Sequence, residues 1–128
     1  MNQQTLELTF NDVSGDLASR YAHELRDMLL DATPDIEVER ERDKVHAQDL
    51  GNILSIVIPT VASIATAAST VIIAYIRYNR TSVKVTRKDD GAIMEIGPLK
   101  DEENAVRALA LFLQGPKDHK QDDHIQND

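Results

Sequence analysis

The chain of 128 residues contains no cysteine and no tryptophan, and it has only three tyrosines and two phenylalanines. Without cysteine, the chain has no disulfides, no thiolate metal ligands and no cysteine nucleophile. Because aromatic side chains are so few, the core has to be built from Ile, Val, Leu and Ala. The first 20 residues are polar and hold no apolar stretch, so we expect no secretory signal. These features favour a cytoplasmic protein.

Length and composition are those of one folded domain. Hydrophobic residues make up 41% of the chain and charged residues 28%. A chain of this length can bury one sizeable core but not two. We therefore expect a single domain over residues 1–114 and a disordered acidic tail over residues 115–128, which show no periodicity.

The net charge of −8 is unevenly distributed. Residues 1–49 carry 12 acidic and 5 basic side chains, and residues 89–128 carry 10 acidic and 4 basic ones. Such an acidic chain is not expected to bind nucleic acid. Between these regions lies a basic segment without acids, which we predict to be a partner-docking patch: Arg77, Arg80, Lys84, Arg87 and Lys88. A structural role is also compatible with the sequence, because Arg77 and Arg80 suit the negative end of a preceding helix.

The first 42 residues predict a strand, a helix and a second strand. "TLELTF", residues 5–10, alternates apolar and polar side chains, which is typical of a half-buried strand. Ser14 is a suitable N-cap for a helix that Pro34 stops. The apolar face of that helix is Leu17, Tyr21, Leu25, Met28 and Leu29. The alternation resumes in "DIEVERER", residues 35–42, which predicts a short second strand. Two strands joined by such a helix most simply run parallel.

Residues 81–97, "TSVKVTRKDDGAIMEIG", predict a β-hairpin. Asp90 and Gly91 suit the positive φ angles of a type I′ turn between alternating segments. A final helix follows, with Asp101 as N-cap and Gly115-Pro116 as its end. Its buried stripe is Val106, Leu109, Ala110 and Leu113. The fold class is therefore an α/β (α+β) sandwich of about four strands covered by helices, in the order strand, helix, strand, long helix, strand, strand, helix.

Residues 53–76, "ILSIVIPTVASIATAASTVIIAYI", form a run of 24 residues without a charge. A membrane span has this length. However, the large side chains gather on one helix face and hydroxyl-bearing ones trace the other, which favours a core helix over a lipid-facing one. Pro59 leaves two alternatives: a continuous or kinked helix from Asp49, or a separate strand over 53–58 with a helix starting at Pro59. Asp49 is a good cap, which favours the first.

Small residues recur at every fourth position along this run and would let another helix approach closely. The predicted self-association face comprises Ser55, Ala62, Ser63, Thr66, Ala67, Thr70 and Ala74. The alternative is that these small residues merely face a crowded sheet or water.

No residue pattern predicts catalysis or a cofactor. The histidines His23, His46, His119 and His124 are not spaced as metal ligands. The chain has no glycine-rich phosphate loop and no serine in a nucleophile elbow. We expect a protein that is not an enzyme and holds no cofactor or metal.

The region 5–113 resembles a bacterial family, the effector-associated constant component of type one. The resemblance lies in an arrangement that starts with an N-terminal "LELTF" strand, a leucine-patterned helix and "DLGNILSIVI" leading into an alanine-rich helix. That helix ends in "AYIRYNR", and the hairpin "SVKVTRKDDGAIMEI" and a short terminal helix complete the pattern. It implies a small non-catalytic partner of an effector, such as a protease, in a bacterial conflict system.

Three functions follow as hypotheses. The first is a non-enzymatic adaptor, sensor or scaffold that forms homo-oligomers and pairs with an effector protein encoded nearby in a defence system. The second is a membrane-active or membrane-anchored effector that inserts a helix over residues 50–76 into lipid. The third is an inhibitor that presents its acidic surface to a basic toxin.

Overall fold

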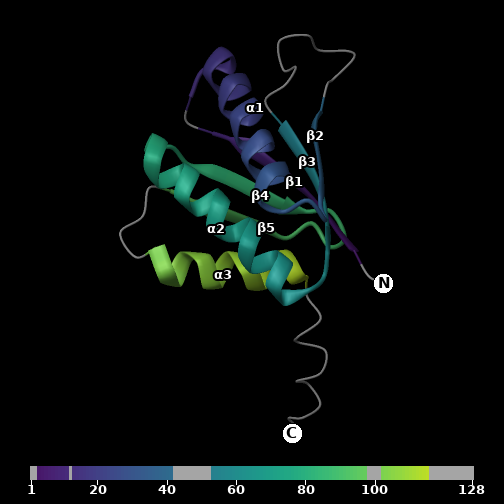
Figure 1. The fold of residues 1–128 in the computed structure, drawn as a ribbon. Helices are drawn as coiled ribbons and strands as arrows, with labels where there is room; N and C mark the ends of the chain where they lie inside the picture. The colour runs from purple at the N-terminus through teal and green to yellow at the C-terminus, as the bar shows by residue number, and fades with distance from the viewer. Residues whose placement is uncertain (1–2, 12, 42–52, 98–101, 116–128) are drawn as a thin grey trace, which may run out of the picture.

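The computed structural model describes residues 3–11, 13–41, 53–97 and 102–115. These residues form a five-stranded sheet with three helices on one of its faces (Figure 1). The elements are β1 (Gln3–Phe10), α1 (Gly15–Ala32), β2 (Glu37–Glu41), β3 (Ile53–Pro59), α2 (Ala62–Asn79), β4 (Val83–Arg87), β5 (Ile93–Ile96) and α3 (Glu102–Gln114). The predicted α+β fold class is confirmed.

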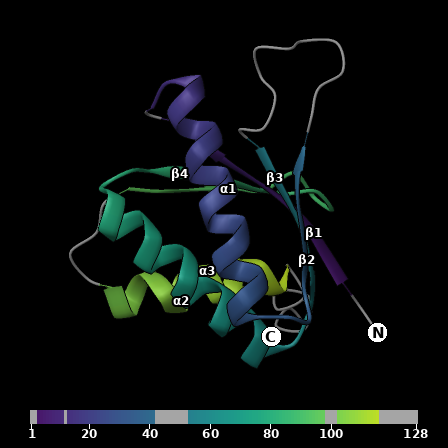
Figure 2. The same ribbon diagram turned by 45° about the horizontal axis from the view of Figure 1, so that its top comes forward.

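The strand order is β2-β3-β1-β4-β5, and every neighbouring pair is antiparallel. Since β1 and β2 are both antiparallel to β3, they run in the same direction, as predicted, but β3 lies between them. Figure 2 shows β4 nearly edge-on, with α2 and α3 on the same side of it. The sheet therefore has one covered and one open face.

The preferred prediction of a continuous or kinked helix across residues 53–59 is wrong. These residues are β3, in which Leu54, Ile56 and Ile58 are buried and the alternate residues are half-buried. The helix begins only at Ala62, after an extended Val61 that provides no side-chain cap. A helix spanning 50–76 therefore does not form. Asp49, its predicted cap, lies outside the described residues.

The additional strand also explains why the sheet has five strands where about four were predicted. β3 fills the position between β1 and β2, and it pairs with β1 over residues Gln3–Thr9. A run of β-branched side chains suits this position, because pleated strands accommodate branching at Cβ better than helices do. Pro59 is tolerated as the last residue of the strand.

The core lies between the sheet and the helices. Leu6 and Leu8 of β1 are fully buried, in one core cluster with Leu25 and Leu29 of α1 and with the buried isoleucines of α2. Three aromatic rings, Phe10, Tyr21 and Tyr75, form edge-to-face pairs with centroids 5.5, 6.2 and 5.7 Å apart. Met28, predicted for the buried face of α1, is instead 42% exposed.

The helix ends agree with the sequence where the structure describes them. The Leu17 amide donates to the Ser14 hydroxyl at 3.4 Å, which confirms Ser14 as the N-cap of α1. Gly115 follows α3 with a φ of 96°. The other predicted cap, Asp101, and the predicted tail from residue 116 onward lie outside the described residues.

The β4–β5 hairpin forms, but its turn is not type I′. Gly91 has a positive φ of 75°, whereas Asp90 does not, so only one of the two positions required for that turn is present. The Gly91 amide donates to the Arg87 carbonyl at 2.8 Å, which closes a longer loop. The Arg87 amide donates in turn to the Ala92 carbonyl at 2.8 Å.

Within the described part of the chain, no helix combines the length and the apolar character needed to cross a bilayer.

Candidate functional site

The exposed face of α2 is unusual for a surface helix because most of it lacks charged residues. From Ala62 to Ile76 the helix has no charged residue, although a surface helix normally carries charges on its solvent side. Most of the predicted self-association face lies here: Ala62, Ser63, Thr66, Thr70 and Ala74 are exposed, and Ala67 is half-buried. These six residues form what we call the α2 small face.

Ser55 does not belong to this face. It lies on β3, half-buried, in the alternation opposite to the buried residues Leu54 and Ile56. Its side chain is therefore on the open side of the sheet, away from the helices. The prediction grouped Ser55 with the helical residues because it assumed that one helix spans the entire run.

A hydrogen bond within the helix reduces the polarity of the α2 small face. The Thr70 hydroxyl donates to the Thr66 carbonyl at 2.9 Å. This satisfies the hydroxyl donor inside the helix, so a partner need not supply an acceptor for it. The surface is therefore easier to desolvate than a count of its hydroxyl groups suggests.

A groove lies between α2 and α3, on one side of the α2 small face. Thr66 lines it from α2, and Val106, Ala110 and Leu111 line it from α3, with Glu103, Arg107 and Gln114 at its polar margins. Its volume is about 310 Å³. Leu111 is 54% exposed, so a large apolar side chain is available to a partner there. We call this feature the α2/α3 groove.

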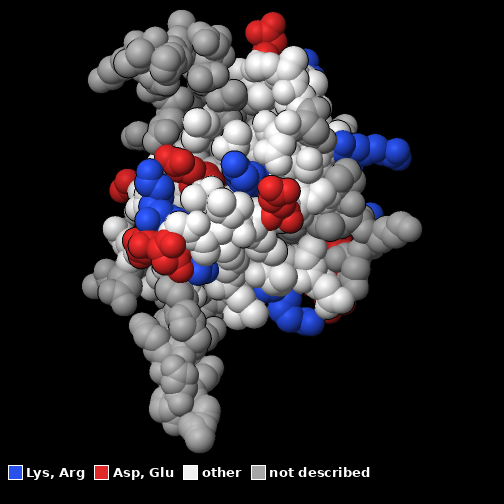
Figure 3. All heavy atoms as spheres, turned by 180° about the vertical axis from the view of Figure 1, so that it is seen from behind, with Lys and Arg blue, Asp and Glu red and all other residues white. Residues whose placement is uncertain are grey.

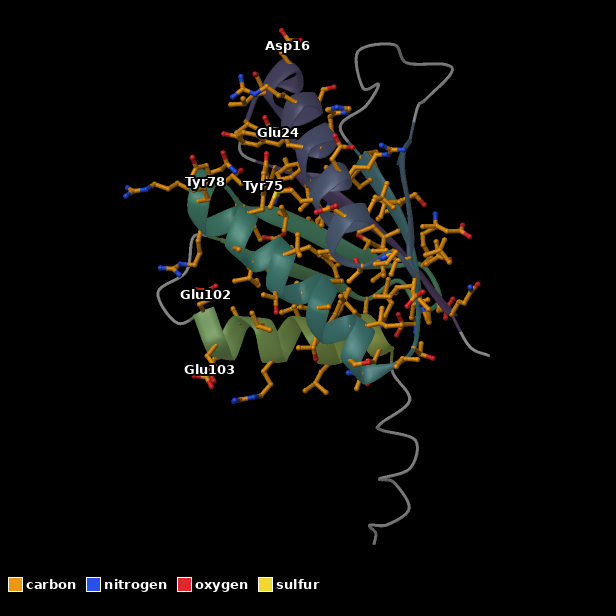
Figure 4. The ribbon with its side chains drawn as sticks, viewed as in Figure 1. Asp16, Glu24, Tyr75, Tyr78, Glu102 and Glu103 are labelled. Carbon is orange, nitrogen blue, oxygen red and sulfur yellow. The ribbon has the colours of Figure 1, made fainter. Side chains whose placement is uncertain are left out.

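A second depression, of about 420 Å³, lies between α1 and α2. It is lined by Met28 of α1 and by Ala74, Tyr75 and Tyr78 of α2, and we call it the α1/α2 hollow. Tyr78 is 86% exposed, the largest value among the exposed large hydrophobic residues that the structure describes. Figure 4 shows Tyr75 and Tyr78 at the C-terminal end of α2, with Glu24 of α1 beside Tyr75.

Tyr75 joins the two helices at the base of this hollow. Its hydroxyl donates to Glu24 Oε1 at 2.6 Å, and its ring is 4% exposed. Burial, together with the hydrogen bond to Glu24 and its charge, raises the pKa of Tyr75 well above its ordinary value. The phenol therefore stays protonated and continues to donate at any physiological pH. This bond and the aromatic cluster hold the walls of the hollow in place.

The predicted docking patch is divided among three locations. Arg77 forms an ion pair with Glu102 at the start of α3, and Arg80 is the C-cap of α2, in the left-handed conformation with a φ of 52°. Both lie at the C-terminal end of α2, where cations favour the helix dipole. The other three residues belong to β4 and its turn.

Arg87 is a buried structural residue and is not available for docking. Only 11% of its side chain is exposed, because β4 places it on the covered face with Val83 and Val85. It donates to both carboxylate oxygens of Asp90 at 3.0 and 2.7 Å and to the Phe112 carbonyl at 3.1 Å. Its guanidinium also lies 4.6 Å from the centre of the Phe112 ring. Arg87 thus ties the hairpin turn to the end of α3.

Lys84 and Lys88 do not form a basic patch either. Lys84 is half-buried on the open face of the sheet, in register with Glu95 on β5. Lys88 donates to Glu7 Oε2 at 3.0 Å. Seen from the side opposite the helices, acidic and basic side chains are interspersed (Figure 3). The open face is therefore not a surface of one charge.

The histidine and carboxylate side chains that the structure describes are not arranged to hold a metal ion. His23 is exposed and lies 3.5 Å from Asp27 on the next turn of α1. The other three histidines lie outside the described residues. Among the described residues, no group of three or more His, Asp or Glu side chains is arranged to hold a metal ion.

Comparisons with known proteins add no assignment. No protein-family model, no curated protein and no solved structure matches the chain.

The sequence patterns did not identify Met28, Tyr78 and Leu111 as surface residues. Met28 fits the apolar stripe of α1 and so was predicted to be buried. Tyr78 and Leu111 lie outside the apolar stripes of their helices. This position could have predicted their exposure, because a large apolar residue outside a helix stripe is exposed unless another element covers it.

Proposed function

We propose that this protein is a non-enzymatic adaptor or scaffold module that self-associates and pairs with an effector protein in a bacterial defence system. The observation that carries the self-association is the α2 small face, which is exposed, uncharged and flanked by an apolar depression on each side. The resemblance to the effector-associated constant component family supports the pairing with an effector and a location in the cytoplasm.

Small side chains favour this use of α2 on physical grounds. Two helices approach most closely where Gly, Ala, Ser and Thr line the contact, and close approach increases van der Waals contact along the backbone. A face that merely met solvent would gain nothing by excluding charge over four turns. Self-association would cover this face without burying a charged group.

The test of self-association is to enlarge the small face. The double substitution Thr66→Leu/Thr70→Leu should weaken association roughly 10- to 100-fold, because overpacking a close contact costs about 1–3 kcal/mol. Light scattering across a concentration series measures the change. Ala108→Leu, an equally apolar change at an exposed position of α3, is the control and should leave the mass unchanged. An unchanged mass for the double variant would contradict the proposal.

Pairing with an effector is tested separately at the α2/α3 groove. Co-expressed with the product of the adjacent gene, the wild-type chain should co-purify with it at a fixed ratio. Leu111→Lys should reduce the retained partner about tenfold, because it places a charge in the apolar groove. Ile93→Lys, at an exposed position of β5, is the matched control. Equal retention of both variants would count against the groove as the contact.

A further inference from the structure

The α1/α2 hollow and the side chains around it point to a specific mode of self-association. We infer that two copies pair about a two-fold axis, with Tyr78 of each copy entering the α1/α2 hollow of the other. This inference rests on the proposed function, because it specifies how the self-association occurs. The inference is drawn from the apolar lining of the hollow, the exposure of Tyr78 and the charges on α1 and at the end of α2.

The hollow and its occupant are both apolar and both exposed. Met28, at 42% exposure, and Tyr78, at 86%, are two of the four large hydrophobic side chains that the described residues leave exposed, and both line this one depression. A tyrosine ring buries a large area with little loss of side-chain freedom, and tyrosines are enriched at the centres of interfaces. In a two-fold pair, contact of Tyr78 with the partner's Met28 implies the reciprocal contact, so one mutual insertion covers both copies.

The charges on the two helices are complementary in this arrangement. On the surface of α1, Glu24 lies one turn before Met28 and Asp31 one turn after it. The end of α2 carries Arg77 and Arg80 on either side of Tyr78 in the sequence. Insertion of Tyr78 beside the partner's Met28 therefore brings a basic helix end toward an acidic helix surface, twice in each pair.

The other charged groups around the hollow do not reverse this balance. Arg20 of α1 forms an ion pair with Glu24, with 3.9 Å between Nε and Oε2, and Arg77 forms an ion pair with Glu102. Arg26 and His23 both lie beside Asp27. Asp31 and Arg80 are the exposed residues of opposite sign best suited to meet across the pair, so they are the residues to exchange in a test.

The first arm of the experiment removes the inserted ring from the full chain. Tyr78→Ser should raise the dissociation constant of the pair roughly 10- to 30-fold, measured by analytical ultracentrifugation over a concentration series. Tyr78→Phe should stay within about twofold of the wild type, because the hollow is apolar. Ile93→Ser, an exposed apolar residue on β5, serves as the matched control. Both positions are exposed, so the three variants should keep the fold.

The second arm tests reciprocity with charge reversals. Asp31→Lys alone and Arg80→Glu alone should each weaken self-pairing about fivefold, because each creates like-charge contacts at both ends of the pair. An equimolar mixture of the two variants should regain wild-type affinity as a mixed pair, since opposite charges then meet at both ends. High salt should reduce all of these differences.

The outcomes separate this inference from the proposed function. Weakening by Tyr78→Ser together with recovery in the mixture supports the reciprocal pair. If Tyr78→Ser pairs like the wild type, or the mixture recovers no affinity, the reciprocal pair is overturned. Self-association would then still stand if Thr66→Leu/Thr70→Leu reduces it. A wild-type chain that remains monomeric throughout the concentration series would overturn both.

Discussion

Replacement of Arg87 by methionine is expected to destabilise the protein by about 2–3 kcal/mol. The substitution keeps an apolar stem of similar length but removes the hydrogen bond to the Phe112 carbonyl and the stacking on the Phe112 ring. It also removes the two bonds that hold Asp90 in the hairpin turn. Urea denaturation, followed by a far-ultraviolet signal, measures the loss as a lower midpoint at an unchanged slope.

Lys88→Met is the matched control for this prediction. Lys88 is the next residue in the chain, and its ion pair with Glu7 joins two partly exposed side chains. Exposed ion pairs contribute little, so this variant should unfold within about 0.5 kcal/mol of the wild type. Equal midpoints for Arg87→Met and the wild type would show that Arg87 is not the structural link described above.

The wild type and Arg87→Met can also be compared as a function of pH. The hydrogen bonds from Arg87, followed by the one from the Ala92 amide, lower the pKa of Asp90 from 3.8 to about 2. Because this pKa is depressed in the folded state, the stabilisation is complete above pH 3.8 and is lost as the pH falls toward 2. The stability difference between wild type and Arg87→Met should therefore shrink over this window. A difference that stays constant with pH would exclude the Arg87–Asp90 contact as its source.

Gly115→Ala is expected to cost about 2–4 kcal/mol, for two separate reasons. The φ of 96° is in a region that alanine rarely adopts. In addition, an added Cβ would lie 1.9 Å from Nε2 of Gln4, a side chain that is 4% exposed and so has little room to move. Calorimetric or urea unfolding of the variant measures the sum of the two effects.

Gly91→Ala separates the two contributions. Gly91 also has a positive φ, of 75°, but an added Cβ there would meet nothing within 4 Å. Its cost should be the backbone strain alone, about 1 kcal/mol. In the Gln4→Ala background, the cost of Gly115→Ala should fall to about 1 kcal/mol, because the contact is gone but the strain remains. Identical costs in both backgrounds would rule out the contact with Gln4.

The position of Arg87 could have been predicted from the sequence. Val83, Val85 and Arg87 have the same parity along β4, so the alternation that predicts two buried valines also predicts a buried arginine. Charge led instead to a docking prediction, because arginine is usually exposed. The side chain is accommodated because three acceptor atoms and one ring surround it. No local pattern shows that those partners, on the turn and on α3, converge there.

Local sequence patterns do not determine the secondary structure of residues 53–59. The segment "ILSIVIP" is compatible with a buried strand and with a buried helix, since both consist of large apolar residues. Pairing decided between them: β3 receives backbone hydrogen bonds from β1 on one side and β2 on the other. β1 lies far away in the sequence, and a central strand without it would leave buried backbone groups without acceptors or donors.

The sequence by itself determined the elements whose signals are short in range: the first strand, the capped helix α1, the hairpin strands and α3, together with an α2 that lacks charge. Side-chain alternation, caps and breakers act over a few residues, and their effect does not depend on the rest of the fold. The tertiary structure alone decided the order of the strands, the division of the apolar run into β3 and α2, and the exposure of Met28. Each of these depends on which distant surface covers a side chain, and burial between distant segments is a property of the packed molecule.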